Sequence, residues 1–155
     1  MEDRMIQKMG ADKVPAAQAH LARLGLQDGI QFRLGGRIGN TLRAHQLIAF
    51  CEKEDEEKGS GVTNAVVEGM FRAHFEEERD IADVDTLVAI AGEAVPGLDL
   101  ARVRDWLETG QGVQEIERLA AQAREEGLRG VPILAQVYFP VDFMLFSMKG
   151  SAPPA

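Results

Sequence analysis

Three histidines, one cysteine and many carboxylates are the side chains in this sequence that could do chemistry. His20, His45 and His74 are far apart in the chain, and none has a second histidine or a carboxylate at the spacing of an HExxH-type metal site. His74 is followed by Glu78 four residues later, but helix surfaces produce such pairs by chance. Isolated histidines usually have structural roles. The sequence therefore predicts no metal ligand and no cofactor.

Cys51 is the only cysteine, so the sequence offers no pair for an internal disulfide. It falls in the middle of a predicted helix, on the apolar face, and Glu52 follows it. A reactive thiol needs a lowered pKa, which a helix N-terminus or a neighbouring cation provides. We therefore expect Cys51 to be a small buried hydrophobic residue. A lone cysteine also fits a reducing compartment, and we expect the protein to be cytoplasmic.

Other catalytic patterns are missing from the sequence. The segment LGGRIGN (34–40) is rich in glycine, but it lacks the preceding strand and the following Lys-Ser/Thr of a phosphate-binding loop. No Ser-His-Asp arrangement has motif support. The acidic stretches EKEDEEK (52–58) and FEEERD (75–80) are typical of solvated helix ends.

The composition indicates a globular protein, with 45% hydrophobic residues and a net charge of −8 in 155 residues. This length suits one domain with a modest core. Nucleic acids and anionic membranes bind mainly to basic surfaces, so we expect neither as a partner. The longest apolar stretch, residues 131–146, is shorter than a membrane span and contains Pro140 and Asp142.

The elements that must position these side chains are predicted to be helices. Apolar residues recur at helical spacing in successive segments, and polar residues that can cap a helix precede them. The predicted caps are Asp12, Asn40, Thr63, Asp83 and Asp99, and the predicted stops include Gly25, Gly59 and Gly127. The predicted apolar faces are Ala44, Leu47, Ile48 and Cys51 in one helix, and Val67, Met70, Phe71, His74 and Phe75 in the next. A last helix is expected at 112–126.

The pattern changes after Gly127. Residues 133–138 and 141–146 are apolar with β-branched and aromatic content, and Pro140 lies between them, which predicts a β-hairpin. A hairpin alone is marginal, and no other long strand is predicted. Its uncovered apolar edge could cause self-association into a homo-oligomer. We expect the tail, residues 151–155, to be disordered.

Four segments together resemble one family. They are KMGAD (8–12), GIQFRLGGRIGNTLRAHQLIAF (29–50), VVEGMFRAHFEEERDIADVDTLVAIA (66–91) and LRGVPI (128–133). In this order and at these distances they resemble the DsbA-like thioredoxin-fold oxidoreductases of the FrnE branch. These are related to 2-hydroxychromene-2-carboxylate isomerase and the kappa-class glutathione transferases.

The resemblance implies a thioredoxin-like α/β fold that is incomplete in this chain. Residues 1–128 would form the helical domain inserted into that fold, and residues 129–150 would form a cis-proline loop and a hairpin remnant. Val131 would offer its backbone to an extended substrate, and Pro132 would be cis and face the reactive cysteines. Asn40 and His45 would hold the first long helix of a helical lid against the rest.

The family's Cys-x-x-Cys and first strands would precede Met1, so we expect an N-terminally truncated family member. Without a dithiol, two-cysteine disulfide exchange is impossible, so no residue is predicted to be catalytic. The resemblance implies a polypeptide or small-thiol substrate and an activity that is absent or impaired. Two alternatives remain open: a relative of the glutathione-dependent branch, and a non-enzymatic helical binding module or truncated gene product.

Overall fold

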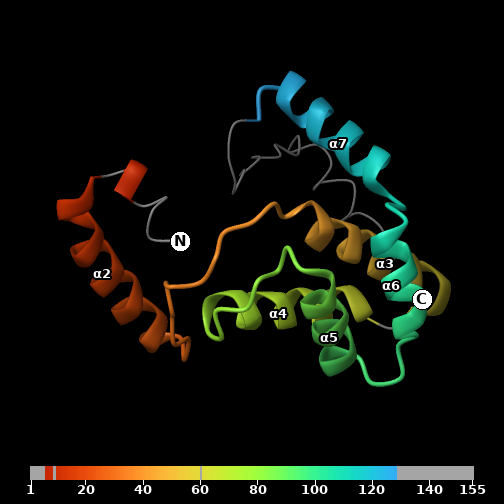
Figure 1. Cartoon of the computed structure of the whole chain (residues 1–155), viewed down its shortest axis with the longest axis horizontal. Coiled ribbons are helices and arrows are strands. Elements are labelled where there is room, and N and C mark those ends of the chain that lie inside the picture. The colour runs from red at the N-terminus through yellow and green to blue at the C-terminus, as the bar shows by residue number, and fades with distance from the viewer. Residues whose placement is uncertain (1–5, 9, 60, 129–155) are drawn as a thin grey trace, which may run out of the picture. The chain divides into compact units, whose positions relative to one another are not determined.

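The computed structural model of the chain describes residues 6–8, 10–59 and 61–128. Within these ranges there is no strand, and residues 6–8 are helical. The other elements are a 3-10 helix and six α-helices (Figure 1). They are η1 (Ala11–Lys13), α2 (Val14–Gln27), α3 (Leu42–Lys58), α4 (Val62–Phe75), α5 (Val84–Ala94), α6 (Leu100–Glu108) and α7 (Val113–Glu125). The prediction of a mostly helical chain up to residue 128 is confirmed, whereas the predicted hairpin lies outside the described residues.

The core lies between α3, α4, α5 and α6, which pack against one another (Figure 1). Each helix contributes apolar residues spaced three or four positions apart, which brings them onto one face. Burying these faces removes apolar surface from water and is the main stabilising term. Fully buried side chains include Leu47, Val66, Leu87, Ile90 and Val103.

The structure places the buried face of α4 differently from the sequence prediction. Val66, Met70 and Ala73 face the core, whereas Phe71 is 57% exposed. Both faces of this helix are apolar, so periodicity alone could not tell which one the neighbouring helices cover. The other face, which carries Phe71, is therefore not used by the core.

Helix capping agrees with the sequence at α5 and α6. The Asp83 carboxylate accepts a hydrogen bond from the amide of Thr86, and Asp99 accepts from those of Ala101 and Arg102. The predicted cap of α4, Thr63, is wrong because this helix begins at Val62.

The amides at the start of α4 are satisfied from the preceding helix. Asp55 in α3 accepts hydrogen bonds from the amides of Val62 (2.7 Å) and Thr63 (3.0 Å). A carboxylate that meets the free N–H groups of a helix stabilises it, and it also opposes the positive end of the helix dipole. One side chain of α3 therefore caps the first turn of α4.

Asp55→Ala should lower the free energy of unfolding by about 1–2 kcal/mol, the range for loss of a helix cap. Chemical denaturation measures this change. Glu56→Ala, an exposed neighbour on the same helix, is the matched control and should change stability by less than about 0.5 kcal/mol. Equal effects of the two substitutions would contradict a capping role for Asp55.

Two predictions about α2 are wrong. Asp12 lies in η1 and makes no side-chain cap, and the helix continues past Gly25 to Gln27. Gly25 is buried because Phe32 packs onto it, and a Cβ there would lie 2.5 Å from the Phe32 ring. This glycine permits a close contact, and the chain turns at Gly29, which has a φ of 79°.

The last described helix, α7, matches the predicted bounds within one residue at each end. None of its residues is buried, and Leu119 is 50% exposed. In the described part of the chain, no helix has both the length and the apolar character needed to cross a membrane.

Candidate functional site

An apolar groove of about 700 Å³ lies between the end of α4, α2 and the segment that joins α2 to α3. Six apolar side chains line it: Leu21, Ile30, Phe32, Leu34, Phe71 and Phe75. Three charged residues complete the lining: Glu68, Arg72 and Glu76. Concave sites that are mainly apolar, with a few polar groups at their edges, are typical of ligand sites.

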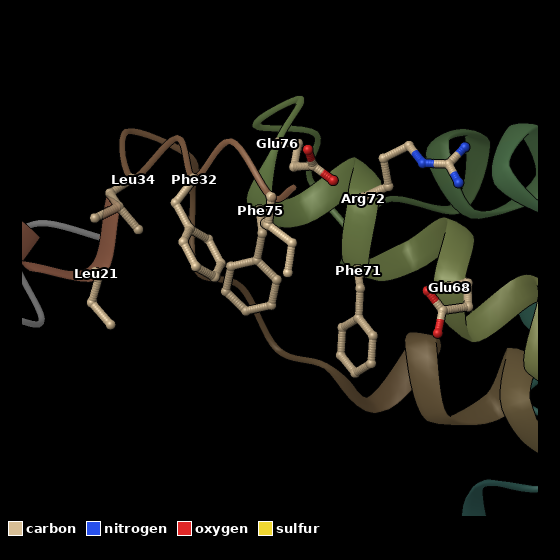
Figure 2. Close-up of a pocket in the computed structure, with 9 residues that line it drawn as sticks. Leu21, Phe32, Leu34, Glu68, Phe71, Arg72, Phe75 and Glu76 are labelled. Carbon is tan, nitrogen blue, oxygen red and sulfur yellow. The ribbon is translucent and has the colours of Figure 1, made fainter. Parts of the chain in front are cut away.

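Three phenylalanines form the centre of this groove. The rings of Phe32 and Phe75 meet edge to face, with centroids 5.8 Å apart, and Phe71 lies 6.2 Å from Phe75. Figure 2 shows these rings on one side of α4, with Arg72 and Glu76 directed toward the other side. The groove therefore offers an aromatic floor to a ligand, with charged groups at its edge.

The segment 30–34 is an extended chain held against the end of α4. The amide of Gln31 donates to Glu76 Oε2 (3.2 Å), and that of Arg33 donates to the carbonyl of Phe75 (2.7 Å). Side chains alternate along extended backbone. Gln31 and Arg33 therefore make the hydrogen bonds to the end of α4, while Ile30, Phe32 and Leu34 line the groove.

Charged side chains near the groove differ in how they are paired. Arg79 binds Glu93 (2.9 Å), and this hydrogen bond is the main cause that raises the pKa of Arg79. Glu68 and Arg72, both on α4, are exposed, and no ion pair joins them in the described part of the chain. The Glu68 carboxylate is therefore available to polar groups of a ligand.

Cys51 is fully buried in the core, and its surroundings disfavour the thiolate form. Burial raises the pKa of its thiol to about 12, and the carboxylates of Asp55, Glu54 and Glu52 add to the shift. Both causes oppose the charged thiolate, which is the nucleophilic form. The expectation that Cys51 is a buried hydrophobic residue is confirmed.

A family model for the DSBA-like thioredoxin domain matches residues 3–136, most of the chain. This chain belongs to the DSBA-like thioredoxin domain family. The match includes every residue of the groove. A search of curated proteins finds no match to this chain.

The three histidines of this DSBA-like chain do not come together. His20 contacts Arg23 one turn away, and His45 Nδ1 bonds to the Thr41 carbonyl (2.8 Å). His74 packs edge-on against Phe75, and its buried Nδ1 has no hydrogen-bond partner within the described ranges. Among the described residues, no group of three or more histidine, cysteine or acidic side chains could hold a metal ion.

The residues predicted to hold the first long helix make local bonds. Thr41 is the N-cap of α3, and Asn40, one residue earlier, accepts a hydrogen bond from the Leu42 amide (2.9 Å). Asn40 and His45 are both exposed. Their predicted role in holding the lid stays a prediction. Val131 and Pro132 lie outside the described residues.

Gln46 and Trp106 join the first long helix to α6 in this DSBA-like domain. The indole Nε1 of Trp106 donates to the Gln46 carbonyl (3.0 Å), and the Gln46 amide donates to the Gln111 carbonyl (3.1 Å). Phe50 packs edge-on against the Trp106 ring, with centroids 5.7 Å apart. One feature of the sequence could have indicated this contact, namely the single tryptophan among the apolar residues of its helix.

Proposed function

We propose that this chain is a FrnE-type member of the DSBA-like family that binds polypeptide and does not itself exchange disulfides. The buried state of Cys51 carries the second half of this proposal, since a thiol with a pKa near 12 has almost no thiolate at neutral pH. Exchange by the two-cysteine route would need a thiol in addition to the single cysteine of this sequence. A cytoplasmic, reducing location is consistent with one free thiol.

The aromatic groove supports the first half of the proposal. Its floor is apolar, and its volume of about 700 Å³ suits two or three apolar side chains of an extended segment. The carboxylate of Glu68, which also lines the groove, can pair with charged or polar groups beside those side chains. An extended polypeptide has this alternation of apolar side chains and polar backbone.

The family resemblance points to the same class of ligand. In that family the residue before the cis-proline, Val131 here, presents its backbone to an extended substrate. By this resemblance the Val131–Pro132 joint would bind a polypeptide, the class of ligand that the groove also suits. A small thiol such as glutathione is the alternative ligand, because it would need the joint but not the three phenylalanine rings.

A binding experiment tests the role of the groove. The probe is a fluorescein-labelled, cysteine-free peptide with alternating leucines, titrated with the full chain and followed by fluorescence anisotropy. Phe71→Ser should weaken binding about tenfold or more, because a mostly exposed aromatic ring makes its main contact with the ligand. The stability of this variant should change little for the same reason.

The control is Leu119→Ser, which removes an equally accessible apolar side chain from α7. It should bind the peptide like the unmodified chain. Equal affinity of Phe71→Ser and the unmodified chain would refute the groove as the peptide site. Binding of glutathione that Phe71→Ser leaves unchanged, together with no binding of the peptide, would favour the small-thiol alternative.

A further inference from the structure

Glu78 has an unusual backbone conformation just beyond the groove. Its φ is 59°, and among the described residues it is the one non-glycine residue with a positive φ. This left-handed region is unfavourable for a residue with a Cβ atom, and glycine or asparagine adopts it more readily. Glutamate at such a position indicates that its side chain has a specific role.

The conformation directs the Glu78 carboxylate to the segment that forms one wall of the groove. Glu78 Oε1 accepts a hydrogen bond from the amide of Gly35 at 2.7 Å. A Cβ at Gly35 would lie 2.5 Å from that oxygen, and one at Gly36 would lie 3.3 Å from the Cα of Glu78. Gly35 and Gly36 therefore allow the wall to approach Glu78, and these two glycines need no phosphate ligand to explain them.

The hydrogen bond to Glu78 is the third in a regular series that holds the wall against the residues at the end of α4. The amides of residues 31, 33 and 35 donate to Glu76, Phe75 and Glu78 respectively. Because these residues alternate along an extended chain, their attachments orient Phe32 and Leu34 into the groove. The carboxylate of Glu78 secures the end of the wall nearest Leu34.

We propose that Glu78 is a positioning residue for peptide binding, which fixes the wall of segment 30–36 so that Phe32 and Leu34 meet the ligand. The inference rests on the proposed function of the groove. In the absence of this hydrogen bond, the end of the wall loses a charge-assisted anchor. The ligand would then have to order the segment when it binds, at a cost in affinity.

Two substitutions at Glu78 distinguish the effect of side-chain length from the effect of the left-handed backbone. Glu78→Gln keeps an acceptor oxygen at the same reach. Glu78→Asn suits the left-handed backbone better but is one methylene too short. With the same peptide probe, Glu78→Gln should bind within about threefold of the unmodified chain, and Glu78→Asn should bind about tenfold more weakly, as expected for loss of a hydrogen bond to a charged group.

Hydrogen exchange at the amide of Gly35 gives a second measurement. It should be protected in the unmodified chain and in Glu78→Gln, and should exchange about tenfold faster in Glu78→Asn while the α3–α6 core stays protected. An unprotected Gly35 amide in the unmodified chain would overturn the proposal even if Glu78→Asn failed to fold. Equally weak binding by Glu78→Gln and Glu78→Asn would overturn it too, because the acceptor oxygen would then have no effect.

The outcomes distinguish this inference from the function on which it rests. Equal binding by Phe71→Ser and the unmodified chain would refute the groove itself. If Phe71→Ser lost binding but a folded Glu78→Asn bound like the unmodified chain, the groove would stand and the positioning role of Glu78 would fail.

Discussion

At pH 8, iodoacetamide should alkylate Cys51 about a thousandfold more slowly in the folded chain than in the chain unfolded by urea. The reacting species is the thiolate, and burial with nearby carboxylates raises the pKa of this thiol from 9.0 to about 12. Because each pH unit below the pKa reduces the thiolate fraction tenfold, the fraction in the folded chain is very small. Mass spectrometry of quenched time points measures both rates.

The same shift makes stability depend on pH. Between pH 9.0 and about 12 the unfolded chain loses the thiol proton while the folded chain keeps it. The folded state then binds more protons, so the free energy of unfolding falls as pH rises through this window and is unaffected by this group below it. Cys51→Ala, which keeps an apolar side chain, should show a smaller loss over the same window.

Two results would contradict this view of Cys51. One is rapid alkylation of the folded chain at pH 8. The other is an insulin-reduction assay in which the unmodified chain has turnover well above that of Cys51→Ser. Either would mean that the thiol reaches solvent as a thiolate and that the chain takes part in disulfide chemistry by itself.

Leu87→Ala should lower the free energy of unfolding by about 2–5 kcal/mol. Leu87 has no exposed surface and lies in the cluster shared by α3, α4, α5 and α6. The substitution removes buried apolar contacts and leaves a cavity that neighbouring side chains fill only in part. Urea denaturation followed by the fluorescence of Trp106, the single tryptophan, measures the loss.

Leu119→Ala is the matched control, since it removes the same atoms from a side chain that is 50% exposed. It should change the free energy of unfolding by less than about 0.5 kcal/mol. A loss below about 1 kcal/mol for Leu87→Ala would mean that the four-helix cluster is not the stabilising core of the described part of the chain.

Local sequence patterns determined most of the helices. The helical repeat of apolar residues predicted α3, α5, α6 and α7, because such a repeat forms one face wherever the chain is helical. Asp83 and Asp99 were predictable as caps since a cap bonds amides two or three residues away. The buried state of Cys51 followed from its place on an apolar face.

Interactions between distant segments were decided only by the tertiary structure. The cap of α4 comes from Asp55 on another helix, and Glu78 meets an amide 43 residues earlier in the chain. No local pattern marks either pair, because their separation along the sequence is set by how the chain folds back. The prediction of Gly25 as a helix stop was wrong for the same reason. The Phe32 ring packs where a side chain at position 25 would lie, and this contact exists only in the folded chain.

The candidate site shows the same division. The sequence alone determined that α4 carries apolar residues at helical spacing and that the chain has one cysteine, with no second cysteine to pair with. Only the tertiary structure decided which face of α4 enters the core and which aromatic residues remain at the groove. The physical reason is that hydrophobicity determines which side chains are driven out of water. The packing of neighbouring helices determines which of these side chains are covered.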